Sequence, residues 1–234
     1  MTRIFLLISI LFSLLATSCA QEELHASHCT GITVKDGMRV SILGDSYSTF
    51  RGYLYPESNR TYYPNEKTGV TDVSQTWWHL FIKEQKLKLE CNNSYSGSTI
   101  ARNSDRQGTA YVERYPELGN PELIFIFGAT NDSWQKIPIG TYQYGDWQEE
   151  DLTSFRPAFA YLLHQLQQTY PQAQIVNLIN TDLQKDYKES METICRYYGV
   201  CNLSLGDFEK KDGHPSDKGM KSICQQLTEV LVNK

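Results

Sequence analysis

The chain has 234 residues, enough for one α/β domain with a sizeable core but short for two. Hydrophobic residues make up 40% and charged residues 21% of it, an ordinary globular balance. The formal net charge of −5 argues against nucleic-acid binding, which requires a basic surface. The lysines and arginines are scattered, so they provide no electrostatic basis for binding to a membrane surface.

The first 19 residues have the pattern of a signal peptide. An apolar run from Ile4 to Leu15 follows an arginine, and it is shorter than the roughly 20 residues that a transmembrane helix needs. It ends at Leu15-Ala16-Thr17-Ser18-Cys19, which resembles a bacterial lipobox and predicts a lipid anchor on Cys19. Ordinary cleavage after Ala20 is the alternative. Both readings predict export, as a periplasmic or cell-surface lipoprotein or as a soluble periplasmic or secreted protein.

One of the six cysteines, Cys19, lies at the end of this segment, which leaves five. An exported protein can form disulfides, but an odd number of cysteines leaves at least one thiol unpaired. Cys195 and Cys201 stand on the two sides of an expected helix end, so we predict this pair first. The sequence has no C-x-x-C motif and no Cys/His cluster with zinc spacing, so we expect no metal.

After a polar tail over 20–37, strands and helices alternate along a single domain over 38–234. The expected strands are 40–43, 87–89, 123–127, 174–179 and 200–203, and the expected helices are 74–86, about 151–170, 189–198 and 216–232. The continuous apolar run at 123–127 fits a central strand that is buried on both faces of a parallel sheet. Such an alternation predicts a parallel sheet between two helix layers, with ligands bound at the C-terminal ends of the strands.

Four short segments follow these strands or precede the last helix, namely 44–48, 92–98, 128–132 and 212–215. A serine hydroxyl attacks a carbonyl only when a histidine takes its proton, and fixed N–H donors stabilise the oxyanion that forms. We therefore predict Ser46 as the nucleophile and His214 as the base. The backbone N–H groups of Ser46 and Gly97 and the side-chain amide of Asn131 are the predicted oxyanion hole.

In this order the segments resemble the Ser, Gly, Asn and His blocks of the SGNH (GDSL-type) hydrolases, and the resemblance covers residues 39–232. It implies a flavodoxin-like three-layer α/β/α sandwich with a central, mostly parallel sheet of about five strands. It also implies hydrolysis of carboxylic esters, often of short acyl groups such as acetyl on sugars or lipids. The implied partner is a small-molecule or glycan ester, and no cofactor is implied.

Two positions depart from the blocks of this family. Ala129 stands where the Gly-x-Asn-Asp block has its glycine, and Lys211 stands where the Asp-x-x-His block has its acid. The nearest carboxylate is Asp212, two residues before His214, so we predict Asp212 as the group that orients the imidazole. The alternatives are Asp207, Glu209, a backbone carbonyl and a Ser–His dyad without an acid.

Aromatic residues follow the nucleophile and Asn segments. We predict substrate contacts for Tyr47, Tyr53 and Trp134, because aromatic faces stack on sugar rings; packing within loops is the alternative. Asp45 is expected to fix its turn by accepting hydrogen bonds from loop N–H groups, and Asp132 is expected to help hold Asn131 in position.

Three other functions remain open at this point. One is a flavodoxin-like binding module whose loop over 44–49 cradles a phosphate or a flavin. Another is a glycan-binding surface lipoprotein on the SGNH scaffold with little catalytic activity. The third is acyl transfer, in which an alcohol replaces water in the attack on the acyl-enzyme.

Overall fold

The computed structural model describes residue 29 and residues 31–232. Its centre is a parallel five-stranded sheet in the order β2-β1-β3-β4-β5. The strands are β1 (Arg39–Gly44), β2 (Lys88–Ser94), β3 (Leu123–Phe127), β4 (Gln174–Ile179) and β5 (Cys201–Ser204). The helices are α1 (Trp77–Glu84), α2 (Tyr111–Arg114), α3 (Thr130–Gln135), α4 (Phe155–Thr169), α5 (Lys185–Tyr198) and α6 (Asp217–Leu231). The predicted α/β/α sandwich with about five strands is confirmed.

Short elements complete the fold. A two-stranded antiparallel hairpin consists of β6 (Lys210–Lys211) and β7 (His214–Pro215). The 3-10 turns are η1 (Ser46–Ser48), η2 (Val73–Gln75), η3 (Ser104–Arg106) and η4 (Asp151–Thr153). The predicted signal peptide, its Cys19 and the first part of the polar tail lie outside the described residues.

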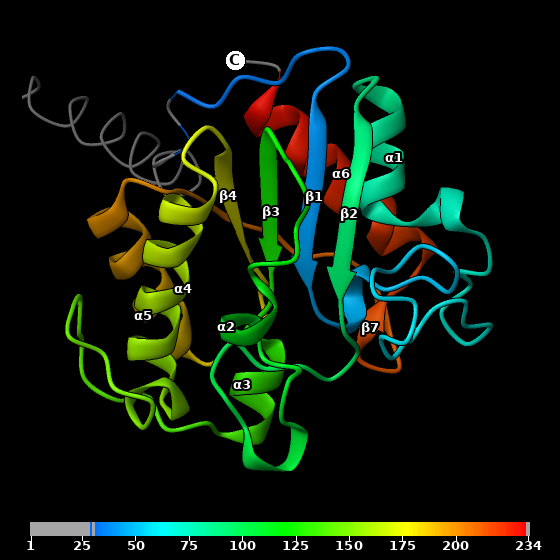
Figure 1. The fold of residues 1–234 in the computed structure, drawn as a ribbon. Helices are drawn as coiled ribbons and strands as arrows, with labels where there is room; N and C mark the ends of the chain where they lie inside the picture. The colour runs from blue at the N-terminus through cyan, green and yellow to red at the C-terminus, as the bar shows by residue number, and fades with distance from the viewer. Residues whose placement is uncertain (1–28, 30, 233–234) are drawn as a thin grey trace, which may run out of the picture.

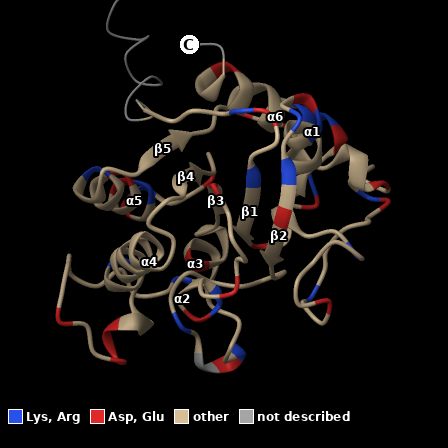
Figure 2. Ribbon diagram, turned by 45° about the horizontal axis from the view of Figure 1, so that its top comes forward, with Lys and Arg blue, Asp and Glu red and all other residues tan. Residues whose placement is uncertain are grey.

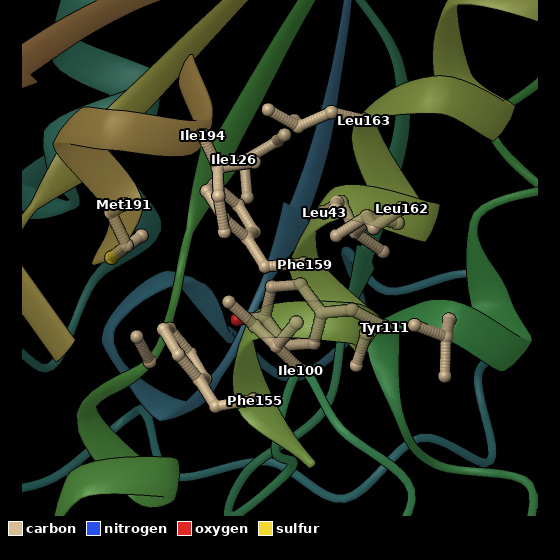
Figure 3. Close-up of a cluster of buried hydrophobic side chains, with 14 of the residues drawn as sticks. Leu43, Ile100, Tyr111, Ile126, Phe155, Phe159, Leu162, Leu163, Met191 and Ile194 are labelled. Carbon is tan, nitrogen blue, oxygen red and sulfur yellow. The ribbon is translucent and has the colours of Figure 1, made fainter. Parts of the chain in front are cut away.

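The helices cover both faces of the sheet, with α1 and α6 on one face and α4 and α5 on the other (Figure 1). The apolar run of β3 is unbroken because both faces of this strand are buried. Leu123, Phe125 and Phe127 belong to the hydrophobic cluster that includes α1 and α6. Ile124 and Ile126 belong to the cluster on the opposite face, and side chains of α4 and α5 surround Ile126 (Figure 3). Alternate residues of a strand point to opposite faces, so a central strand must be apolar throughout.

Within the central sheet, β3, β4 and β5 carry no charged side chains, whereas β1 and β2 do, and the other charged side chains of the described residues lie on the helices, the loops and the hairpin (Figure 2). The strand arrows of β1, β2 and β3 point to one edge of the sheet, at which α3 and β7 lie (Figure 1). Since all five strands are parallel, every loop that follows a strand begins at this edge. No helix in the described part of the chain is long and apolar enough to cross a membrane.

The structure corrects the predicted disulfide. Cys201 is bonded to Cys29, and the buried Cys195 is a free thiol. Cys195 projects from α5 into the cluster on one face of the sheet, whereas Cys201 at the start of β5 belongs to the cluster on the other face. The sheet therefore separates the two sulfurs that the sequence places close together.

Some boundaries also differ from the predictions. Helix α5 begins at Lys185 rather than 189, because its inward face already starts at Tyr187 and continues with Met191 and Ile194. The short helices α2 and α3 and the β6–β7 hairpin were not predicted, because they are too short for a hydrophobic period to reveal them.

Candidate active site

Ser46 and His214 are hydrogen-bonded at the C-terminal edge of the sheet. The distance from Ser46 Oγ to His214 Nε2 is 3.0 Å, although 168 positions separate the two residues in the chain. Ser46 is the first residue of η1, directly after β1, and His214 begins β7. This is the contact by which an imidazole can take the proton of an attacking hydroxyl.

The turn that carries Ser46 is held by Asp45. This carboxylate caps η1 by accepting the N–H of Tyr47 at 3.0 Å, as expected for a turn-holding residue. Burial raises the pKa of Asp45 to about 7, and the nearby Asp132 carboxylate adds to the shift. The Asp45 side chain therefore stabilises the turn that carries Ser46.

His214 is oriented by a backbone carbonyl. Its Nδ1 lies 2.8 Å from the carbonyl oxygen of Asp212, which accepts the Nδ1–H when Nε2 is the basic nitrogen. Asp212 and Gly213 have φ angles of +53° and +72° and connect β6 to β7. Two consecutive left-handed residues, Asp-Gly, are characteristic of a two-residue type I′ hairpin turn. This backbone conformation brings the carbonyl, rather than the side chain, to the imidazole.

The Asp212 carboxylate makes its contacts elsewhere. Its Oδ2 accepts the hydroxyl of Tyr62 at 3.4 Å and lies 3.8 Å from Lys67 Nζ. The side chain is 56% exposed. The structure therefore corrects the predicted contact between this carboxylate and the imidazole, and it favours the backbone carbonyl among the alternatives.

Three aromatic rings surround the imidazole of His214. Tyr62 is stacked on it, with ring centroids 3.5 Å apart and planes at 9°. Tyr47 and Trp134 approach it with their planes at steep angles, at centroid distances of 5.4 and 6.2 Å. Burial lowers the pKa of His214, while the bond to the Asp212 carbonyl and the charge of Asp212 oppose the shift. A lowered pKa keeps the ring neutral, the form that can act as a base.

The predicted oxyanion donors lie together. Asn131, in α3, donates its Nδ2 to the carbonyl of Ser98 at 3.0 Å and has a longer contact of 3.4 Å with Asp45 Oδ2. Among the described residues, the backbone N–H groups of Ser46 and Gly97 have no hydrogen-bond acceptor. Gly97 has a φ of +87°, and a Cβ there would collide with the guanidinium of Arg106. The two backbone N–H groups are thus free to donate to a ligand, whereas the Asn131 amide already donates to Ser98, and the positive φ favours glycine at position 97.

Asp132 links α3 to the loop that carries Gly97. Its carboxylate accepts the backbone N–H groups of Ile100 and Ala101, at distances from 2.8 to 3.1 Å. Burial raises its pKa to about 7. This agrees with the expected structural role, since the bond fixes the Asn131 helix against the glycine loop.

Arg114 was not predicted from the sequence, because an arginine in a four-residue helix carries no recognisable pattern. It is buried, and its guanidinium donates to the carbonyls of Gly44, Asn93 and Thr109 and to the side chains of Asn93 and Ser98. Burial lowers its pKa to about 10. Arg114 therefore joins the end of β1 to the loop after β2, the two segments that supply Ser46 and Gly97.

The model of the family "GDSL-like Lipase/Acylhydrolase" matches residues 38–231. The chain belongs to this family.

Solved structures agree with this assignment. A protein from Bacteroides ovatus assigned as a GDSL-like lipase has 45% sequence identity and a TM-score of 0.82, over 86% of this chain and 100% of its own. One from Bacteroides uniformis, with the same assignment, has 47% identity and a TM-score of 0.81, over 85% and 97%. A family two carbohydrate esterase from Clostridium thermocellum, in complex with cellohexaose, shares the fold at 15% identity and a TM-score of 0.59, over 85% and 65%. A search of curated protein sequences found no match. As a GDSL-like acylhydrolase, the protein is a hydrolase that acts on esters.

The departure of this GDSL-like chain at position 129 has a conformational consequence. Ala129 adopts a φ of +68° at the start of α3. Only glycine reaches this left-handed region without strain, which explains why the family's block has a glycine here. The alanine is fully buried, and the Asn131 side chain is still held against the loop of Gly97 by its bond to the carbonyl of Ser98.

The predicted substrate-contacting aromatics differ in their surroundings. Tyr47 is buried, and its hydroxyl donates to the carbonyl of Gly213 at 2.8 Å, so it supports the hairpin turn. Trp134 is 49% exposed beside His214. Tyr53 is 44% exposed and packs against Phe50 and Trp78. Tyr62, the ring in closest contact with the base, was not selected because sequence position alone does not distinguish it from the other loop tyrosines.

Proposed function

We propose that this GDSL-like hydrolase is a serine esterase that cleaves short-chain carboxylic esters through an acyl-enzyme on Ser46. The observation that carries the proposal is the 3.0 Å contact between Ser46 Oγ and His214 Nε2. A nucleophile, its base and an oxyanion hole are the minimum set for acyl transfer.

In the proposed reaction, His214 Nε2 takes the hydroxyl proton as Ser46 Oγ attacks the ester carbonyl carbon. The resulting oxyanion accepts hydrogen bonds from the N–H groups of Ser46 and Gly97 and from the amide of Asn131. Each such donor contributes about 2.7–4 kcal/mol to the stabilisation of the transition state. The Asp212 carbonyl accepts the Nδ1–H of the imidazolium. His214 then protonates the leaving alcohol, and a water attacks the acyl-enzyme by the same steps in reverse.

Sugar esters are the proposed substrate class. The base delivers its proton to the leaving alcohol, so the alcohol must lie beside His214. The exposed indole of Trp134 borders this ring, and aromatic faces bind sugar rings by stacking.

Export with a lipid anchor on Cys19 is part of the proposal. The disulfide between Cys29 and Cys201 supports export, because disulfides persist mainly outside the cytoplasm. The alternative is cleavage after Ala20, which would leave a soluble exported enzyme. Mass spectrometry of the mature N-terminus distinguishes this cleavage from lipidation of Cys19.

The flavodoxin-like alternative is disfavoured by the loop that follows β1. Ser48 and Thr49 are buried, and their hydroxyl groups already bond to Trp77 Nε1 and to the carbonyl of Ser46. They are therefore not free to cradle a phosphate group.

The decisive experiment is turnover of p-nitrophenyl acetate by the purified wild-type protein and by Ser46→Ala, with labelling by an organophosphonate. We expect turnover and labelling that Ser46→Ala abolishes. A wild-type protein that is neither active nor labelled would refute the esterase. Tight glycan binding without turnover would instead support a glycan-binding lipoprotein. A panel of acetylated sugars and of p-nitrophenyl esters of increasing chain length then tests the substrate class, and added alcohol acceptors test for acyl transfer.

A further inference from the structure

We propose that Tyr62 is a positioning residue for His214: its stacked ring, together with the Asp212 carbonyl, holds the imidazole in the orientation that bonds to Ser46. The inference rests on the proposed esterase function and concerns the same site. It starts from the observation that no carboxylate in the described residues bonds to Nδ1, so the orientation of the base must come from other groups.

The two hydrogen bonds of the imidazole leave one motion weakly restrained. The Ser46 hydroxyl and the Asp212 carbonyl lie at opposite nitrogens of the ring, at 3.0 and 2.8 Å. Bonds at opposite ends fix the direction of the line that joins them, but they resist rotation of the ring about this line only weakly. A flat contact over the ring face opposes this rotation directly. Tyr62 provides it, with its plane within 9° of the imidazole plane and its centroid 3.5 Å away.

Tyr62 is itself tied to the nucleophile. Its backbone N–H donates to Thr49 Oγ1 at 2.9 Å, and this hydroxyl donates to the carbonyl of Ser46 at 3.1 Å. The next residue, Tyr63, is buried and donates its hydroxyl to the carbonyl of Pro215 at 2.7 Å. The segment is therefore anchored both to the turn of Ser46 and to the strand of His214, and it can hold the two reacting side chains in register.

The Asp212 side chain contacts the Tyr62 hydroxyl. Asp212 Oδ2 accepts this hydroxyl at 3.4 Å, while the backbone of the same residue bonds to the imidazole. Asp212 thus contacts both rings of the stack, one through its carboxylate and one through its carbonyl. When the imidazole becomes positively charged, the face of the phenol ring attracts it.

The test compares Tyr62→Leu, which removes the ring, with Tyr62→Phe, which keeps the ring and removes the hydroxyl. Tyr62→Leu should lower kcat for p-nitrophenyl acetate by about 10- to 100-fold and leave KM within about threefold, because the reacting groups lose their alignment. The rate of organophosphonate labelling should fall in parallel. Tyr62→Phe should restore kcat to within about threefold of wild type. The matched control is Tyr197→Leu, which removes an exposed tyrosine that is stacked on Tyr144 near the far end of α5.

A second measurement reports on the stack without catalysis. The ring current of a stacked tyrosine shifts the ring protons of His214 upfield in the NMR spectrum. Tyr62→Leu should abolish this shift, whereas Tyr62→Phe and Tyr197→Leu should preserve it. Circular dichroism confirms that each variant is folded, and Tyr62→Met replaces Tyr62→Leu if the latter is not.

Several outcomes overturn the inference. One is a kcat of Tyr62→Leu within threefold of wild type. Another is a raised KM of Tyr62→Leu at unchanged kcat, which would assign Tyr62 to substrate binding. A third is failure of Tyr62→Phe to restore kcat. An unchanged His214 spectrum in Tyr62→Leu also overturns it. Failure of the esterase proposal is distinguishable, because it appears as an inactive and unlabelled wild-type protein whatever the NMR spectra of the Tyr62 variants are.

Discussion

Replacing Asp212 with asparagine separates the two ways in which this residue could act on His214. The substitution removes the negative charge of the side chain but leaves the backbone carbonyl, which lies 2.8 Å from Nδ1. Asparagine also tolerates the left-handed conformation that position 212 requires, with its φ of +53°. The hairpin and the imidazole should therefore keep their geometry.

The expected loss of activity is small because the carboxylate is largely exposed to solvent. Its side chain is 56% exposed, and its partners are the Tyr62 hydroxyl at 3.4 Å and Lys67 Nζ at 3.8 Å. Charge interactions at such exposed sites contribute about 0.2–1 kcal/mol. Even the upper value corresponds to a change of only about fivefold in rate. When a carboxylate does hold Nδ1, its replacement by asparagine lowers kcat by roughly 10⁴-fold.

The assay is kcat for p-nitrophenyl acetate on the plateau of the pH profile, for wild type, Asp212→Asn and His214→Ala. Asp207→Asn is the matched control, since Asp207 is an exposed acid of the same segment and makes no hydrogen bond to His214. We expect Asp212→Asn to remain within about tenfold of wild type and His214→Ala to lose nearly all activity. A loss of 10³-fold or more in Asp212→Asn would refute the reasoning, because it would make the carboxylate the orienting group.

Three further predictions concern charge, burial and the disulfide. Arg114→Met removes five hydrogen bonds in the interior and should lower the free energy of unfolding by at least about 3 kcal/mol in urea titrations. A loss below about 1 kcal/mol would contradict the role given to this side chain. Replacing Cys29 and Cys201 by serine removes a crosslink between residues 172 positions apart and should lower the free energy of unfolding by up to about 5 kcal/mol. Reduction of the wild-type protein should lower it by a similar amount. Equal stability of the oxidised and reduced proteins would disprove this prediction. Because burial lowers the pKa of His214 and the base acts in its neutral form, kcat/KM should persist to a pH below the ordinary imidazole value of about 6.5. Lys210→Met removes a positive charge that also lowers this pKa, so it should move the acid limb to higher pH, and an unchanged or lowered limb would be inconsistent with the arrangement around the base.

The order of the chemical groups along the chain could be read from the sequence. Each of Ser46, Gly97 and Asn131 follows a strand, and His214 precedes the last helix, so a parallel sheet brings all four to one edge. The strand at 123–127 was predicted with its observed bounds, because burial on both faces leaves an unbroken apolar run. These features depend on local periodicity and on the direction of parallel strands, and both can be predicted from the sequence.

The environment of His214 was decided by the tertiary structure. The sequence directs attention to the Asp212 carboxylate, yet the two left-handed residues of the turn bring the carbonyl of this residue to the imidazole. The Asp-Gly pair between Lys211 and His214 is a hairpin signal that could have indicated this geometry. The stacked ring of Tyr62 had no such signal, since its contact joins segments that lie far apart in the chain.

The same distinction holds for the features that support the site. The sequence determined that Ser46 follows the first strand and that five cysteines follow the predicted signal peptide and its Cys19. Only the folded chain decided that Cys29 pairs with Cys201 and that Arg114 joins the segments that carry Ser46 and Gly97. Periodicity reports which face of an element is buried, but it does not report which distant backbone carbonyl, ring or thiol meets a given side chain there.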